Sequence, residues 1–193
     1  MTARRTLVAS LALLFTLLAS SGAHADHRIN RAFQGRRPFQ LDVHGSLSWY
    51  GFGPGGGARF GIPLLHNGFV PSLDNAVYLN FGGDFYLVQD NGCYGVGPTG
   101  PCAAREYRFA MGLPVTLHWE FYFSNQWSAF AELGLQVFLP PSLFYQGSVD
   151  YTEWKGAWVI GAVGGSLHLN DVVSLTLRVG NPYVAFGMTL DLG

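Results

Sequence analysis

The chain has 193 residues and a formal net charge of −1, and only 12% of its residues are charged. A typical soluble domain has about 25% charged residues, so this chain has too little charge to cover a soluble domain of its size. Residues 39–193 contain more acidic than basic residues, and Lys155 is the single lysine of the chain. This composition excludes a basic nucleic-acid-binding surface.

Residues 1–25 have the features of a cleaved export signal. Arg4 and Arg5 precede an apolar core at residues 7–20, and Ala23-His24-Ala25 fits the small-x-small rule for cleavage. This core is shorter than a transmembrane helix, which needs about 20 residues, although a retained anchor is the alternative. The rest of the chain has no apolar helical run, so we expect no inner-membrane helix after cleavage.

Residues 26–38 form an arginine-rich segment that precedes the folded domain expected at residues 39–193. Its arginines are Arg28, Arg31, Arg36 and Arg37. We favour a flexible periplasmic tail. The alternative is a segment that contacts lipid phosphates or a partner.

Apolar and polar side chains alternate in eight segments, which is the pattern of β-strands with two unlike faces. In chain order, these segments are residues 39–49, 58–65, 76–88, 107–121, 127–138, 158–169, 173–179 and 184–192. The alternation is longest in the fourth segment, where Tyr107 and Trp119 belong to one face and Arg108 and Glu120 to the other. Pro63 predicts a bulge or a weakened pairing in the second segment.

The connections between these strands predict a barrel with two unlike ends. Minimal turns at residues 124–126 and 170–171 lie at one end, together with a longer connection at residues 66–75. Long loops at residues 89–104 and 139–157 lie at the other end. Short turns on one side and long loops on the other are typical of outer-membrane barrels.

The two faces of the predicted strands differ in charge. The apolar face has no charged residue, whereas the polar face carries Asp42, Arg59, Asp84, Arg108, Glu120, Glu132, Arg178 and Asp191. A soluble calyx of the lipocalin type would turn the apolar face inward, and a membrane barrel would turn it towards lipid. The small residues that fill the rest of the polar face, and the shortage of lysine, favour the membrane barrel.

Aromatic residues near the predicted strand ends fit the interface belts of a membrane protein. They are Trp49, Tyr107, Trp119, Trp127 and Trp158. Together with the strand pattern, the signal and the loop lengths, they make the chain resemble the small eight-stranded outer-membrane β-barrels of Gram-negative bacteria, of the porin-like OmpA/OmpX type. The chain departs from this pattern at its end, where Leu192 and Gly193 replace the usual terminal aromatic residue.

The resemblance implies a fold, a location and partners. The fold is an all-β, eight-stranded antiparallel up-and-down transmembrane β-barrel that follows a cleaved signal peptide. The location is the outer membrane of a Gram-negative bacterium. The partners are outer-membrane lipid and lipopolysaccharide, with an extracellular ligand or surface as a further candidate.

The inward charges predict a network inside the barrel, which also includes His118 and His168. A three-residue turn at residues 124–126 would place His118 directly opposite Glu132. An eight-stranded barrel is just wide enough for its own side chains, and buried charges must be paired. We therefore favour a plugged lumen over the alternative, which is a proton or ion path.

Two short spacings suggest a hydrolase as a less favoured function. His44-x-Ser46 and Ser166-x-His168 each place a histidine and a hydroxyl on one strand face, and Glu120 could complete a Ser/His/Glu set. Some outer-membrane barrels are lipid A deacylases or phospholipases. Residues two apart on a strand are about 6.5 Å apart, and these residues are expected to point away from lipid, so the spacing is a weak signal.

Two glycine-rich stretches have structural interpretations. Residues 53–57 lack the lysine and the following helix of a phosphate-binding loop, so we expect a hairpin loop. Cys93 and Cys102 lie in a loop rich in glycine and proline, and an exported chain favours a disulfide between them over a metal site. We expect neither a metal nor a cofactor.

Tyr145, Tyr151 and Trp154 lie in the second long loop and are candidates for recognition or for contact with the membrane interface. The sequence as a whole favours an integral outer-membrane protein with a structural or surface-interaction role and no enzymatic activity. The alternatives are a small ion or solute channel, an outer-membrane lipid hydrolase and a soluble calyx.

Overall fold

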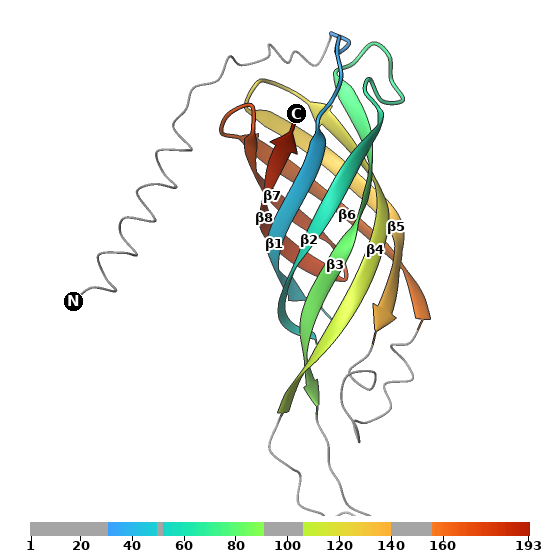
Figure 1. Cartoon of the computed structure of the whole chain (residues 1–193), viewed down its shortest axis with the longest axis vertical. Helices are drawn as coiled ribbons and strands as arrows, with labels where there is room; N and C mark the ends of the chain where they lie inside the picture. The colour runs from blue at the N-terminus through green and yellow to red at the C-terminus, as the bar shows by residue number, and fades with distance from the viewer. Residues whose placement is uncertain (1–30, 50–51, 91–105, 140–155) are drawn as a thin grey trace, which may run out of the picture.

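A computed structural model describes residues 31–49, 52–90, 106–139 and 156–193. In these ranges the strands are β1 (Phe39–Ser48), β2 (Phe52–Leu65), β3 (Asn75–Asp90), β4 (Glu106–Tyr122), β5 (Trp127–Leu139), β6 (Gly156–His168), β7 (Val173–Asn181) and β8 (Tyr183–Leu192). Each strand pairs with its neighbours in the chain, and β8 pairs with β1 (Figure 1). The prediction of an all-β, eight-stranded antiparallel up-and-down barrel is confirmed.

The two ends of the barrel differ. One end, which we call the terminal end, holds residues 31–38, the C-terminus and the connections at residues 66–74, 123–126 and 169–172 (Figure 1). The other end, which we call the loop end, holds the turn at Pro182 and the far ends of β3 and β4. The ranges that the structure describes contain no helix with the length and apolar character needed to cross a membrane.

The expectation that residues 53–57 form a hairpin loop is wrong, because they belong to β2. Gly55, Gly56 and Gly57 pair with β1, and Gly57 lies opposite His44. A Cβ atom on Gly57 would lie 2.6 Å from Oδ1 of Asp84 and 3.0 Å from Nε2 of His44. Glycine is therefore needed here to make room for two large polar side chains of the lumen. The irregularity predicted at Pro63 is confirmed by a register shift between β2 and β3.

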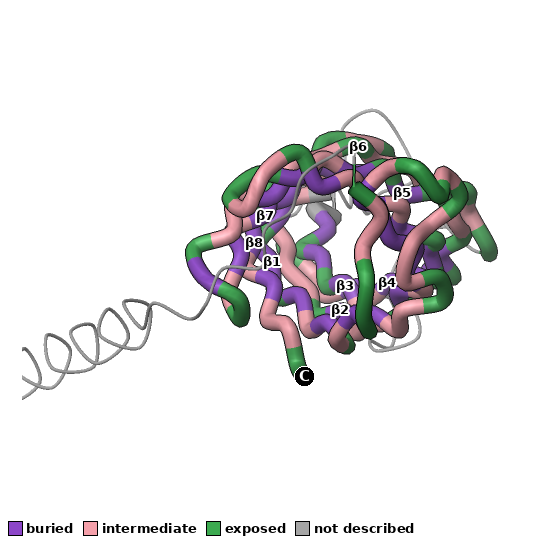
Figure 2. The backbone as a smooth tube through the Cα atoms, turned by 90° about the horizontal axis from the view of Figure 1, so that it is seen from above, coloured by how far each residue is buried: buried purple, intermediate pink, exposed green. Residues whose placement is uncertain are grey.

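The apolar face of the wall lies outside. In β4, exposed Val115 and Leu117 alternate with buried Thr116 and His118, and similar alternation recurs around the barrel (Figure 2). Leu133, at the middle of β5, is 66% exposed. The calyx alternative requires an apolar interior and is therefore wrong about the direction of the two faces.

Part of the arginine-rich segment, at Phe33 and Arg37, is packed against the barrel at its terminal end. Arg37 is buried and forms an ion pair with Asp74, in the connection between β2 and β3. The expectation of a flexible tail is therefore wrong for this part of the segment. Arg31 and Arg36 are exposed, and Arg28 lies outside the described residues.

Gly164, where a Cβ atom would enter the lumen, and Gly161, where it would lie on the outer face beside Leu133, provide a matched test of packing in the lumen. A Cβ atom on Gly164 would lie 2.3 Å from Cζ of Phe130 and 2.4 Å from the carbonyl oxygen of Leu177, whereas one on Gly161 would lie 3.5 Å from its nearest neighbour. We predict that Gly164→Ala lowers the free energy of unfolding by about 1–3 kcal/mol because of overpacking. Gly161→Ala should change it by less than about 0.5 kcal/mol. Urea titration followed by tryptophan fluorescence measures both, and equal stabilities would contradict a tightly packed lumen.

Candidate functional site: the charged lumen

Six buried side chains in the lumen form a closed ring in which acidic and basic residues alternate. In order around the ring, they are Asp42, Arg178, Glu132, Arg59, Asp84 and His44. They belong to β1, β2, β3, β5 and β7, so the ring connects strands that are not neighbours in the sheet. We call this set the charge ring.

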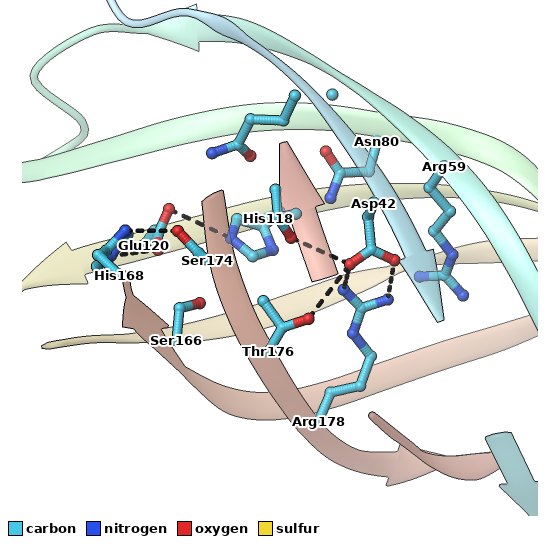
Figure 3. Close-up of a pocket in the computed structure, with 13 residues that line it drawn as sticks. Asp42, Arg59, Asn80, His118, Glu120, Ser166, His168, Ser174, Thr176 and Arg178 are labelled. Carbon is cyan, nitrogen blue, oxygen red and sulfur yellow. Dashed lines mark hydrogen bonds and ion pairs between the residues drawn. The ribbon is translucent and has the colours of Figure 1, made fainter. Parts of the chain in front are cut away.

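Two arginine–aspartate pairs of the charge ring are held by two hydrogen bonds each. Arg178 donates from Nη2 to Oδ2 of Asp42 at 3.0 Å and from Nη1 to Oδ1 at 3.3 Å (Figure 3). Arg59 donates from Nη2 to Oδ2 of Asp84 at 2.6 Å and from Nε to Oδ1 at 3.3 Å. Both guanidinium groups present two nitrogens to one carboxylate, which is the strongest geometry for such pairs.

Glu132 and His44 close the charge ring. Oε2 of Glu132 accepts a hydrogen bond from Arg59 at 3.2 Å, and Oε1 lies 3.6 Å from Nη2 of Arg178. Nδ1 of His44 lies 2.6 Å from Asp42, and Nε2 lies 3.4 Å from Asp84. The predicted charge network did not include His44, which the sequence pointed to only as part of a hydrolase.

Hydroxyl groups surround the two aspartates. Thr176 and Thr189 donate to Oδ2 of Asp42 at 3.4 and 3.2 Å. Tyr183 and Tyr86 donate to Oδ2 of Asp84 at 3.2 and 3.3 Å, and Tyr183 also contacts Arg59. Tyr183 begins β8 one residue before the predicted strand, so its inward position was missed.

His118 connects the charge ring to Glu120. The predicted register is confirmed, because His118 pairs with Glu132 across β4 and β5. Nδ1 of His118 lies 2.9 Å from Oε1 of Glu132, and Nε2 lies 3.8 Å from Oε2 of Glu120. The charged side chains therefore extend from the charge ring towards the terminal end.

His168 lies among hydroxyl groups near the terminal end. Its Nδ1 is 2.7 Å from Oγ of Ser174 (Figure 3). Its Nε2 is 3.0 Å from Oγ of Ser128, which donates to Glu120 at 2.5 Å. The sequence suggested Ser166 as a hydroxyl beside His168, whereas Ser128 and Ser174 come from the neighbouring strands. A serine hydroxyl against an imidazole is the pair that activates nucleophilic serines.

The lumen has little free space around these groups. One cavity of about 20 Å³ reaches from His168 and Ser174 to Arg59, and a second of about 10 Å³ is lined by Arg59, Thr116 and Tyr183. A cavity needs about 10–15 Å³ to hold one water molecule. Neither cavity can accommodate an acyl chain or a hydrated ion.

Arg108 and Asp191 lie towards the ends of the lumen. Asp191 is half-buried near the C-terminus and accepts a hydrogen bond from Gln40 at 3.2 Å. Arg108 is also half-buried and lies towards the loop end of β4. Gly112, which pairs with Asp84 of the charge ring, is four positions from Arg108, or about 13 Å along the strand. The compact charge ring and these two outlying charges therefore occupy different levels of the barrel.

Four of the five predicted interface aromatics lie on the outer wall. Trp158 instead faces the lumen, because it lies opposite buried Gln136 and its ring centre is 6.2 Å from that of buried Phe138, so the prediction for Trp158 is wrong. Trp49, Tyr107 and Trp158 lie towards the loop end, and Trp119 and Trp127 lie towards the terminal end. Trp49, Tyr107 and Trp127 are exposed, and the other two are half-buried. The predicted disulfide of Cys93 and Cys102 and the loop aromatics Tyr145, Tyr151 and Trp154 lie outside the described residues.

Within the residues that the structure describes, no group of three or more His, Cys, Asp or Glu side chains is arranged to hold a metal ion. Comparison of the chain with models of known protein families, and with curated protein sequences, gave no match. The function must therefore be inferred from the barrel itself.

Glu132 provides a test of the charge ring, because it touches both arginines and His118. Glu132→Gln removes the central negative charge, and we predict a loss of about 3–5 kcal/mol in the free energy of unfolding, as expected when one partner of a buried ion pair is removed. Asp191→Asn is the control and should cost less than about 1 kcal/mol, because Asp191 is only half-buried near the end of the barrel and lies outside the charge ring. Urea titration measures both. A Glu132→Gln barrel as stable as the Asp191→Asn barrel would show that the ring contributes little.

Proposed function

We propose that the chain is an integral outer-membrane β-barrel protein of a Gram-negative bacterium, with a plugged lumen and a structural or surface-interaction role. The observation that carries this proposal is the apolar outer wall around a charged interior. This arrangement is the reverse of what a soluble barrel needs.

Two properties of the outer wall, its exposed apolar side chains and its closed backbone hydrogen bonding, support a location of the barrel in lipid. A large exposed apolar area is rare on monomeric soluble proteins, yet Val159, Val163 and Leu133 are each more than 60% exposed. A closed barrel also satisfies its backbone hydrogen bonds within the sheet, which the hydrocarbon interior of a membrane requires. Both features suit a wall surrounded by acyl chains.

The distance between the aromatic groups also suits a membrane. Tyr107 and Trp119 face outward on β4, twelve positions apart, or about 40 Å along a strand. A strand tilt of about 40° reduces this to a height of about 30 Å, close to the outward apolar band of about 25 Å in outer-membrane barrels. The proposed export signal agrees with this location, and contacts with lipopolysaccharide would be a consequence of it.

The filled lumen favours action at the surface over transport. The charge ring crosses the lumen, and the two cavities have space for about one water molecule each. The same lack of space argues against a lipid hydrolase at Ser174. The proposed contacts with an extracellular ligand or surface are therefore assigned to the loop end.

Substitution of one wall residue tests the lipid environment. Leu133→Arg should destabilise the barrel in phospholipid vesicles by about 2–4 kcal/mol, because it places a charge at the middle of the wall. Val172→Arg, at an exposed position in the β6–β7 turn, should cost about 0–1 kcal/mol. Urea unfolding of vesicle-bound protein measures both. If the two variants are equally stable, the middle of the wall is not in hydrocarbon.

Planar bilayer recordings test the plugged lumen. The wild-type protein should insert without giving ion currents, because the charge ring fills the lumen. Steady unitary currents that change in Arg178→Ala would support the channel alternative. Release of fatty acid from outer-membrane lipid, lost in Ser174→Ala, would instead support the hydrolase alternative.

A further inference from the structure

Residues 33–38, which we call the strap, lie across part of the terminal end without joining the sheet. They precede β1, and the strand pairings that close the barrel do not include them. Their polar contacts are with the connection between β2 and β3. The strap could therefore detach without breaking any strand pair.

Arg37 holds the strap in place. Its guanidinium group pairs with Asp74, and the two side chains are only 3% and 4% exposed. Its backbone N–H donates to Nδ1 of His66 at 3.0 Å, and its Nε donates to the carbonyl oxygen of His66 at 3.3 Å. The backbone N–H of Phe33 donates to Oδ1 of Asn67 at 3.2 Å. One buried ion pair and three hydrogen bonds therefore hold the strap, although it is not part of the strand wall.

The strap also contacts the inner surface of the barrel through Tyr122. The central carbon of the Arg37 guanidinium lies 4.1 Å from the centre of the Tyr122 ring and 3.6 Å from the centre of the Phe33 ring. Tyr122 is buried, and its hydroxyl donates to Glu120 at 2.9 Å. Its ring centre is 5.7 Å from that of His168. Arg37 is therefore linked through Tyr122 to His168, which lines the larger cavity.

We propose that the strap is a lid, latched by Arg37 and Asp74, that separates the cavity at His168 and Ser174 from solvent at the terminal end. Asp42, Arg59 and Arg178 of the charge ring line the far end of this cavity, and the ring is a second barrier that the lid does not control. Opening the lid exposes the larger cavity and leaves the smaller cavity closed. This inference does not depend on the membrane location of the barrel.

Cysteine labelling tests the lid. Ser174→Cys places a reporter in the larger cavity, and Thr116→Cys places one in the smaller cavity, each in a background with Cys93→Ser and Cys102→Ser. The reaction rate of each reporter with a small water-soluble methanethiosulfonate reagent is measured in detergent micelles. Circular dichroism confirms that each variant is folded.

Arg37→Ala should raise the labelling rate at residue 174 at least tenfold and leave the rate at residue 116 unchanged. Arg36→Ala is the matched control, because Arg36 is the exposed neighbour of Arg37, and it should change neither rate. Asp74→Asn is a second way to open the latch and should reproduce the effect of Arg37→Ala.

Two results would overturn the lid. Unchanged labelling at residue 174 in both latch variants would mean that the strap does not control access to the cavity. Faster labelling at both reporters would mean that the strap supports the barrel as a whole and has no gating role.

Discussion

The structure depends on the requirement that charges buried in a narrow lumen must be paired. Eight strands leave an interior just large enough for side chains, and an unpaired charge there would cost several kcal/mol. The charge ring satisfies this requirement by joining three carboxylates to two arginines and His44. Because its members come from five strands, the same contacts that pair the charges also brace the barrel across its diameter.

The outer wall and the small inward residues follow from the same constraint. Once the polar side chains occupy the lumen, the alternation of a strand sends every second, apolar side chain outward. Large inward groups then need small neighbours, and Gly57 leaves room for His44 and Asp84 in this way. The filled interior and the exposed apolar wall are thus two consequences of one pattern, and both favour a barrel that works at its surfaces rather than through its lumen.

Much of this arrangement could be predicted from the sequence because strand alternation is a local signal. It gave the number of strands, their faces and the pairing of His118 with Glu132. It could not give contacts between strands that are distant in the sheet, so His44 and Tyr183 were not recognised as parts of the charge network. Glycine propensity suggested a loop at residues 53–57, but the crowding of the lumen makes glycine necessary within β2. The burial of Arg37 depends on Asp74, which is distant in sequence, and a charge pattern alone does not reveal it.

The central claim is that a closed barrel with a filled lumen presents its apolar wall to the outer membrane. Its most direct test is the electrophoretic mobility of the native protein in isolated outer membranes, compared in detergent with and without boiling. The claim predicts that the protein is found in the outer-membrane fraction and migrates differently before and after boiling, since a closed barrel resists detergent until it is heated. Recovery of the protein from the soluble periplasm, with the same mobility in both samples, would contradict it.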